Sequence, residues 1–215
     1  MSASDETLAA LGLDHLIDNR GFLPDPTGAL LDPTGIRVVC AAPGFLRSFR
    51  LILEKESAGA WKTVLKASGR ACGENIARHL DGELSRLGKP ALSGLPLEAC
   101  LVLIERYFAL HGWGLVKLDL TDAAEHGLVV AWLEHSCFVE ALADVDDFVD
   151  PLAAGVLQGF LEYISGEALG CEEIACVRRG APRCAFVVTA QERLDAVGPL
   201  LGREPADAIL ARLKT

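Results

Sequence analysis

The sequence predicts an α+β domain: an antiparallel sheet with helices packed on one side. Long helical patterns fill much of the first half of the chain, whereas alternating apolar and polar residues mark strands in the second half. Turn-forming residues separate neighbouring strands, which favours hairpins over repeated crossovers. The resulting order of helices, strands, helix, strands and helix is typical of the α+β class.

Short elements are expected in the N-terminal region. Residues 4–18 have the pattern of a short helix. The tetrapeptide Asp-Pro-Thr-Gly occurs twice, at 25–28 and 32–35. Because Asp-Pro-x-Gly favours a tight turn, two short strands are expected around these turns. A helix is predicted next, over residues 43–55, and its apolar stripe consists of Phe45, Phe49, Ile52 and Leu53.

Two longer helices are predicted to follow. Over residues 59–87, apolar residues fall on one stripe and charged residues recur every four positions on another. Gly69 and Gly73 lie on this helix, where each costs about 1 kcal/mol relative to alanine. A close approach of another backbone would explain them, and a tolerated pair of glycines is the alternative. The next helix spans about 96–112, and we interpret His111 as a residue at its favourable C-terminal end rather than a catalytic base.

The second half of the chain is predicted to form the sheet. Residues 114–120 alternate as a half-buried strand does, and residues 128–135 form a more apolar strand. Asp150 followed by proline favours a helix start, and this helix continues to about Ser165. Two strands, 171–178 and 183–189, are then joined by a tight turn. One or two helices close the chain.

The composition favours a soluble cytoplasmic protein. The chain of 215 residues holds 30 acidic against 20 basic residues, so it lacks the positive face on which nucleic-acid binding depends. Its longest apolar runs are too short to cross a membrane. Seven cysteines, an odd number, indicate free thiols or metal ligands rather than a disulfide framework.

The segment CEEIACVRRGAPRC, residues 171–184, carries three of these cysteines. If Arg-Gly-Ala forms the turn, paired residue numbers sum to 360, and Cys176 lies directly opposite Cys184. Such neighbours have Cβ atoms about 4.5–5.5 Å apart, which lets two thiolates share one tetrahedral zinc ion. Two buried structural cysteines are the alternative, and a redox pair is less favoured because no C-x-x-C turn is present.

A zinc ion would need two further ligands. Cys171, Glu172 and Glu173 are the nearest candidates, together with residues near the start of the helix at Asp150. Strand alternation places Glu172 on the same face as Cys176, and Cys171 and Glu173 on the other face unless a β-bulge intervenes. Spacing alone leaves the choice open.

Residues 155–188 resemble the C-terminal half of the 4-vinyl reductase domain family. That family's pattern runs from a glycine-spaced helix to an acid, a cysteine, a glycine and a second cysteine. The matching residues here are Gly155, Gly159, Glu173, Cys176, Gly180 and Cys184. The similarity extends over about 36–189, and the glycine-bearing helix also resembles subunits of the TRAPP membrane-trafficking complex, which share the fold.

This resemblance implies a dimeric domain that encloses a hydrophobic pocket for a small ligand. It divides the chain into an N-terminal extension, residues 1–34, and a ligand-binding domain of the 4-vinyl reductase type, residues 35–215. In the aromatic-sensing members a structural zinc ion is held by two cysteines and an acid, which match Cys176, Cys184 and Glu173, and by a third cysteine. Asp150 occupies that last position, where it could bind zinc or cap the helix.

Aromatic residues are the candidate ligand contacts, and a plainly packed core is the alternative reading. Trp132 is the foremost candidate, because its strand resembles the pocket wall of the sensors. The others are Tyr107, Phe108, Trp113, Phe138, Phe160 and Tyr163. His135, of opposite strand parity to Trp132, is expected to face solvent or cap the strand end.

The expected function is therefore a small-molecule sensor or carrier for a hydrophobic or aromatic ligand, with a homodimer surface and a protein partner. An accessory role in tetrapyrrole or bacteriochlorophyll synthesis, or a structural adaptor without ligand, are the alternatives. Enzymatic activity is not favoured, because the sequence contains no phosphate loop, no G-x-S-x-G, no H-E-x-x-H and no dinucleotide fingerprint.

Overall fold

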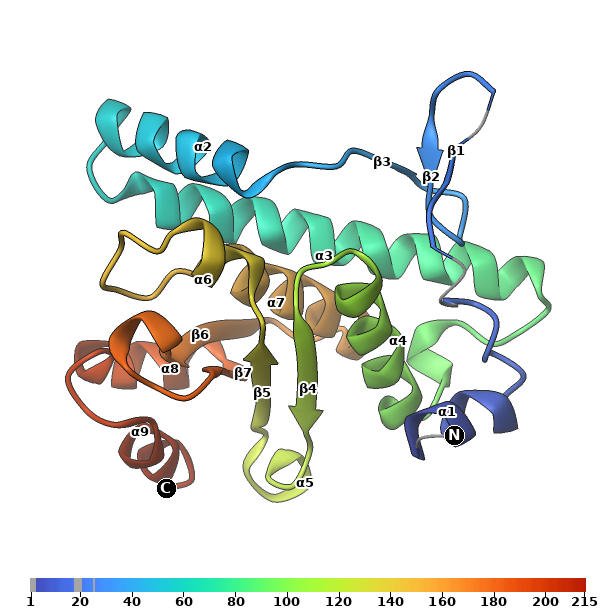
Figure 1. The fold of residues 1–215 in the computed structure, drawn as a ribbon. Coiled ribbons are helices and arrows are strands. Elements are labelled where there is room, and N and C mark those ends of the chain that lie inside the picture. Colours follow the sequence, from blue (N-terminus) through green and yellow to red (C-terminus); the bar gives the residue numbers. More distant parts are fainter. Residues whose placement is uncertain (1–2, 18–20, 25) are drawn as a thin grey trace.

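The main sheet has four antiparallel strands in the order β4-β5-β7-β6 (Figure 1). A computed structural model describes residues 3–17, 21–24 and 26–215. The strands are β4 (Leu115–Asp119), β5 (Val129–Glu134), β6 (Leu169–Ala175) and β7 (Cys184–Ala190). The two central strands, β5 and β7, are joined in register by pairs such as Ala131 with Phe186. The predicted antiparallel sheet is confirmed.

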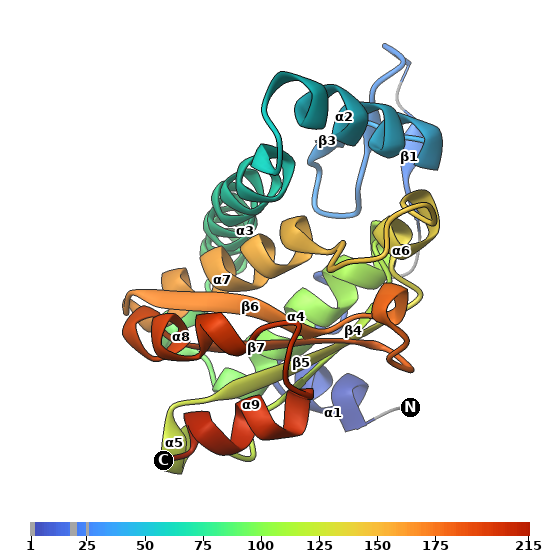
Figure 2. The same ribbon diagram turned by 90° about the vertical axis from the view of Figure 1, so that its left-hand side faces the viewer.

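Helices α3 (Ala60–Arg86), α4 (Leu97–Leu110) and α7 (Pro151–Ser165) pack on one face of this sheet, as predicted. Helices α8 (Gln191–Val197) and α9 (Ala206–Leu213) pack on part of the opposite face (Figure 2). Alternation along the strands explains the division, because Phe186 belongs to the first core and Val187 to the second. No helix among the described residues is long and apolar enough to cross a membrane.

Helices α3 and α7 touch backbone to backbone, which confirms the close approach expected at Gly69 and Gly73. A Cβ added at either residue would overlap a carbonyl oxygen of α7, and one added at Gly155 or Gly159 would overlap a carbonyl oxygen of α3. Paired glycines on both helices remove the side chains that would otherwise hold the axes apart. This contact fixes where α7, and hence the residue before it, lies relative to α3.

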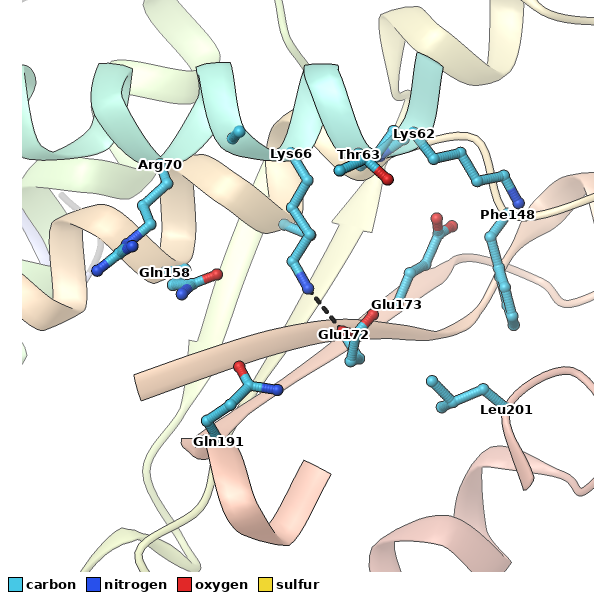
Figure 3. Close-up of a pocket in the computed structure, with 13 residues that line it drawn as sticks. Lys62, Thr63, Lys66, Arg70, Phe148, Gln158, Glu172, Glu173, Gln191 and Leu201 are labelled. Carbon is cyan, nitrogen blue, oxygen red and sulfur yellow. Dashed lines mark hydrogen bonds and ion pairs between the residues drawn. The ribbon is translucent and has the colours of Figure 1, made fainter. Parts of the chain in front are cut away.

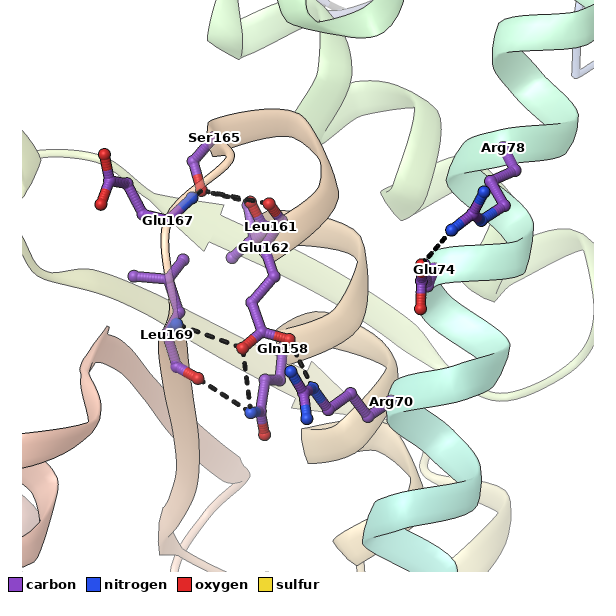
Figure 4. Close-up of polar contacts among 9 residues, drawn as sticks. All are labelled: Arg70, Glu74, Arg78, Gln158, Leu161, Glu162, Ser165, Glu167 and Leu169. Atoms are coloured by element: carbon purple, nitrogen blue, oxygen red, sulfur yellow. Dashed lines mark hydrogen bonds and ion pairs between the residues drawn. The ribbon is translucent and has the colours of Figure 1, made fainter.

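Polar contacts hold one flank of the same helix pair (Figure 4). The Arg70 guanidinium of α3 lies 2.6 Å from a Glu162 carboxylate oxygen of α7. The other oxygen of Glu162 accepts from the backbone N–H of Leu169 at 3.2 Å, at the start of β6. Gln158 donates to the Leu169 carbonyl oxygen at 2.8 Å. Arg70 therefore connects α3 through α7 to the edge strand of the main sheet.

The N-terminal region forms a small sheet on the domain. Strands β1 (Leu23–Pro24), β2 (Leu30–Leu31) and β3 (Arg37–Val38) pair antiparallel. The predicted helix over 4–18 is too long: α1 (Ala3–Ala10) ends before Gly12, whose positive φ of 65° leaves the helical region. The last residue of that prediction and Asp25 of the first Asp-Pro-Thr-Gly turn lie outside the described residues. The second turn is confirmed, because Asp32 accepts from the backbone N–H groups of Thr34 and Ile36.

Helix α2 (Pro43–Glu56) confirms the predicted helix, but most of its apolar stripe faces outward. Phe45 is 61% exposed and Ile52 is 60% exposed. The Phe45 and Phe49 rings stack with their centroids 6.2 Å apart. Two short helices complete the fold, α5 (Ala123–His126) and α6 (Cys137–Ala141). Helix α2 thus leaves an apolar face without a partner among the described residues.

Candidate functional site

A β-bulge shapes the cysteine hairpin. The β6–β7 register shifts between Glu173, which pairs with Phe186, and Ala175, which pairs with Ala185. The predicted register, in which the numbers of paired residues sum to 360, therefore holds only between the bulge and the turn. The extra residue reverses the alternation, so Glu173 rather than Glu172 lies on the side of Cys176, which is the exception that a β-bulge was expected to cause. Glu172 instead pairs with Lys66 of α3 at 2.6 Å.

Four buried side chains converge at this end of the sheet: Asp150, Glu173, Cys176 and Cys184. One ligand atom from each lies within 4.8 Å of the others. The Cys176 and Cys184 sulfurs are 3.8 Å apart. Two sulfurs bound at about 2.3 Å to one tetrahedral zinc ion would lie about 3.8 Å apart. Cys171 is also buried but lies outside this group.

The Asp150 side chain does not cap helix α7. The residue occupies the N-cap position before Pro151, yet its carboxylate accepts no hydrogen bond from the first turn of the helix. It accepts instead from the hydroxyl of Ser136. The Asp150 backbone N–H donates to a Glu173 carboxylate oxygen at 3.0 Å. The capping interpretation is therefore wrong for the side chain, because the carboxylate turns into the cysteine cluster.

Two carboxylate oxygens of the cluster remain without a hydrogen-bond partner in the described part of the chain, Asp150 Oδ2 and Glu173 Oε1. Burial raises the pKa of Asp150 to about 6. Burial, together with the charge of Asp150, raises the pKa of Glu173 well above its usual value. Two ionised carboxylates in such a site need a compensating cation.

The thiol pair supplies the remaining donors of the site. A hydrogen bond from Cys184 lowers the pKa of Cys176 to about 6, and the same bond raises the pKa of Cys184. One sulfur thus has thiolate character, and sulfur with carboxylate oxygen is a ligand set that zinc accepts. The four residues present fit a closed, four-coordinate divalent ion.

An aromatic pocket of about 430 Å³ lies elsewhere, between the N-terminal segment and the C-terminal end of α4. Residues 36–41 form one wall, and Tyr107, Trp113 and Phe138 contribute to the other. The Trp113 ring packs edge-on against Tyr107, with centroids 5.9 Å apart. The structure thus brings three of the seven predicted ligand contacts to one pocket.

The other four predicted contacts do not line this pocket, although the Phe108 ring packs edge-on against Trp113. Phe108 and Phe160 are fully buried in the main core. The Tyr163 hydroxyl donates to Asp81 of α3 at 2.8 Å. Trp132 packs on the opposite face of the sheet, 4.2 Å below the Arg183 guanidinium, because its parity on β5 points it toward α9. Trp132 therefore does not join the other aromatic candidates.

Sequence reasoning missed the pocket role of His111. It follows α4 as the expected C-cap residue, and its ring stacks on Tyr107 with centroids 3.8 Å apart. It also lines the pocket. Its Nε2 lies 3.4 Å from an Asp32 carboxylate oxygen. Only the tertiary fold brings Asp32 of the N-terminal turn to this position, so no local signal indicated the pair.

A second groove, of about 540 Å³, separates α3 from the edge strand β6 (Figure 3). Its basic side chains are matched by acids. Lys62 lies 2.6 Å from an Asp147 oxygen and Lys66 lies 2.6 Å from a Glu172 oxygen. Arg70 is paired with Glu162 as described above. This groove therefore offers no excess positive charge to an anion.

Comparisons with known proteins place these features. Residues 130–190 match the model of the 4-vinyl reductase domain family. The phenol-responsive sensory domain of the transcription activator PoxR, solved with phenol, superposes with a TM-score of 0.63 at 18% identity, covering 100% of this chain and 98% of that one. This similarity shows the same fold.

Two further structures are less similar. A vinyl-4-reductase family protein from Methanocaldococcus jannaschii gives a TM-score of 0.48 at 18% identity, covering 71% of this chain and 83% of its own. Subunit 3 of the trafficking protein particle complex from Naegleria fowleri, covalently bound to palmitic acid, gives a TM-score of 0.47 at 14% sequence identity. The match covers 68% of this chain and 93% of that one. None of the curated proteins matches the sequence.

Proposed function

We propose that this chain, whose residues 130–190 match the 4-vinyl reductase domain, senses or carries a small apolar or aromatic molecule. The observation that carries the proposal is the aromatic pocket beside Tyr107, Trp113 and Phe138, in a fold shared with a phenol-responsive sensory domain. Its volume is within the range of small-molecule sites, and its lining of aromatic and aliphatic side chains suits a ring.

The proposal includes a structural zinc ion held by Asp150, Glu173, Cys176 and Cys184. Support comes from the two partnerless carboxylate oxygens and from the 3.8 Å separation of the sulfurs. When bound, the ion would compensate the buried negative charge. Four protein ligands leave no open coordination position, so the ion would stabilise the fold rather than catalyse a reaction. It would tie the start of α7 to the β6–β7 hairpin.

The proposal also includes a homodimer formed through α2. Phe45, Phe49, Leu51 and Ile52 are all exposed on this helix, and Val64 of α3 is 39% exposed. Large apolar side chains exposed together on one helix, here with the Phe45 and Phe49 rings stacked, are a feature of association surfaces. A self-complementary face around one helix suits a twofold dimer. Residues 36–41 of the pocket wall directly precede α2, which would connect ligand occupancy to the dimer.

Ligand-dependent melting tests the function. The purified chain is heated with a panel of probes: phenol, toluene, naphthalene, palmitic acid and a porphyrin. A ligand that binds only the folded state stabilises it, by about 2.7 kcal/mol when the ligand concentration is a hundred times its Kd. The melting temperature therefore rises with ligand concentration. We expect saturable shifts with the small aromatic probes. Absence of a shift across the whole panel would overturn the proposal, and a shift with the porphyrin alone would favour a tetrapyrrole role.

A further inference from the structure

We infer that Ser136 is a positioning residue of the four-ligand cluster, which holds the Asp150 carboxylate so that one of its oxygens is free for a metal ion. This inference rests on the proposed zinc site and adds a residue outside its ligand set. Ser136 lies between the end of β5 and the start of α6, and it is 5% exposed. Its hydroxyl contacts the carboxylate of Asp150, which is fully buried.

The hydrogen bonds of Ser136 determine where its hydroxyl hydrogen goes. Its Oγ accepts from the backbone N–H groups of Phe138 at 3.1 Å and Val139 at 3.3 Å. A hydroxyl has two lone pairs and one hydrogen, so these two bonds use its capacity to accept. The hydrogen is therefore donated to Asp150 Oδ1. An ionised carboxylate, which only accepts, is the matching partner.

The donation from Ser136 gives the two oxygens of Asp150 different roles. Oδ1 is engaged by the hydroxyl, whereas Oδ2 is buried and has no hydrogen-bond partner within the described residues. Glu173 shows the same division, because Oε2 accepts from the Asp150 backbone N–H at 3.0 Å and Oε1 has no partner in that part of the chain. Each acid thus has one oxygen held by the protein and one left over. Carboxylates that bind metal ions are oriented by outer hydrogen bonds in this way.

A strained backbone residue directs Ser136 toward the cluster. Among the described residues, His135 is the only non-glycine with a positive φ, at 56°. Had β5 continued in extended form past Glu134, alternation would have placed Ser136 on the sheet face of Trp132, away from α7. The left-handed turn at His135 instead brings Ser136 against Asp150. A non-glycine residue keeps this conformation only where the surrounding structure compensates its cost, and such residues gather at functional sites.

The zinc affinity of the full chain tests the inference, measured by competition with a chromophoric chelator on protein stripped of metal and reloaded. Ser136→Ala should weaken zinc binding by roughly ten- to a hundredfold, as the loss of an outer hydrogen bond to a ligand does. Ser136→Thr keeps the hydroxyl and should keep most of the wild-type affinity. Equal affinities for wild type and Ser136→Ala would overturn the inference and leave the zinc site in place, whereas a wild-type chain that binds no zinc would overturn both.

Ser136 also caps α6, so the loss of the cap has to be separated from the loss of the donor. Ser136→Gly has no hydroxyl, but glycine is a better N-cap residue than alanine. It should therefore bind zinc as weakly as Ser136→Ala, and it supplies the measurement should Ser136→Ala not fold. A Ser136→Gly chain with the wild-type zinc affinity would contradict the inference, because the cap rather than the hydroxyl would then be what matters.

Asp150→Asn shows whether Ser136 acts through Asp150. The amide oxygen can still accept from the hydroxyl, but the side chain no longer carries the charge of a carboxylate ligand. In this background Ser136→Ala should change the zinc affinity by less than about twofold, because residues that act as a unit are not additive. A full weakening in the Asp150→Asn chain would contradict the inference.

Bound Co²⁺ gives a second readout, because its visible absorption depends on the ligands and their geometry. Ser136→Ala should change the cobalt spectrum, and Ser136→Thr should not. Ser165→Ala is the matched control, since the Ser165 hydroxyl donates to the Leu161 carbonyl oxygen at 2.8 Å, at the other end of α7. This control should leave both the zinc affinity and the cobalt spectrum unchanged. A cobalt spectrum that is identical in wild type and Ser136→Ala would overturn the inference even if Asp150→Asn binds zinc too weakly to measure.

Discussion

The buried four-ligand cluster and the aromatic pocket are assembled in different ways. The cluster takes Cys176, Cys184 and Glu173 from a single hairpin, and Asp150 from a position 23 residues before Glu173. The pocket joins residues 36–41 to the end of α4 and to α6, segments far apart in the chain. The cluster is therefore part of the sheet, whereas the pocket exists only while the N-terminal segment lies on the domain.

Charge separates the two regions as well. The cluster buries two carboxylates beside a thiol pair, and burial raises the pKa of both acids, so either bound protons or a cation would compensate their charge. The pocket is lined mostly by aromatic and aliphatic side chains. The first arrangement suits a permanent structural ion and the second an exchangeable ligand. Substitutions that affect one region and spare the other can therefore separate these roles.

The contact between α3 and α7 supports both regions, and breaking it should have the largest effect. Gly73→Ala places a methyl group against the Val156 carbonyl oxygen of α7. We expect a loss of about 3 kcal/mol in the free energy of unfolding, at the upper end for overpacking because backbone must move. Gly82→Ala is the control on the same helix, where nothing lies within 4 Å of an added Cβ.

Gly82→Ala should raise the free energy of unfolding by roughly 0.5–1 kcal/mol, because alanine is the better helix former. Urea unfolding followed by circular dichroism measures both variants. Similar stabilities for the two would mean that α3 and α7 are not in backbone contact.

The sequence predicted the cysteine hairpin, and it offered a close backbone approach as one of two explanations for Gly69 and Gly73, because both features depend on local spacing. Glycines four residues apart lie on one face of a helix. The turn residues predicted that Cys176 lies opposite Cys184, and this register holds between the bulge and the turn, where Ala175 pairs with Ala185. The bulge itself left no sequence signal, so strand alternation alone favoured Glu172 beside Cys176, whereas the family resemblance named Glu173. The sequence does not reveal which face of β5 packs against α7, because that depends on the tertiary fold. Trp132 was therefore predicted to lie with the other aromatic candidates, but it packs on the opposite face of the sheet.

Within the cluster, the direction in which Glu173→Gln changes the stability indicates whether a metal ion is bound. With zinc bound, Glu173→Gln removes a charged ligand and should lower the stability by about 2–3 kcal/mol. Without zinc, the same change removes one of two repelling buried carboxylates and should raise the melting temperature. Calorimetric melting, combined with metal analysis of protein purified without chelator, distinguishes the two cases.

Glu172→Gln serves as the neighbouring control for this measurement. Its partner Lys66 is 27% exposed and Glu172 itself is 32% exposed, so the loss of this pair should cost no more than about 1 kcal/mol with or without metal. One zinc ion per wild-type chain and less in Glu173→Gln is the expected metal content. A wild-type chain that contains no metal, with a Glu173→Gln variant of higher melting temperature, would contradict the zinc proposal.

In the pocket, two tryptophans provide a matched pair for ligand affinity. Trp113→Ala removes part of the aromatic wall and should weaken binding of an aromatic probe by roughly ten- to a hundredfold, as loss of a large aromatic contact does. Trp132→Ala removes an equal side chain from the opposite sheet face and should leave the affinity unchanged. Calorimetric titration of phenol measures both, and weakening by Trp132→Ala alone would place the ligand on the α9 face instead.

The apolar face of α2 should give the smallest change in the stability of the single chain and the clearest change in assembly. Phe45→Glu introduces a charge at a position that is 61% exposed, so the folded monomer should lose less than about 0.5 kcal/mol. In a dimer interface the same charge would be buried without a partner, and the dimer should dissociate. Light scattering across a dilution series reports the mass of both proteins. A wild-type chain that is monomeric at every concentration would contradict the proposed dimer, whereas a dimer unaffected by Phe45→Glu would place the interface away from α2 and disconnect it from the pocket wall.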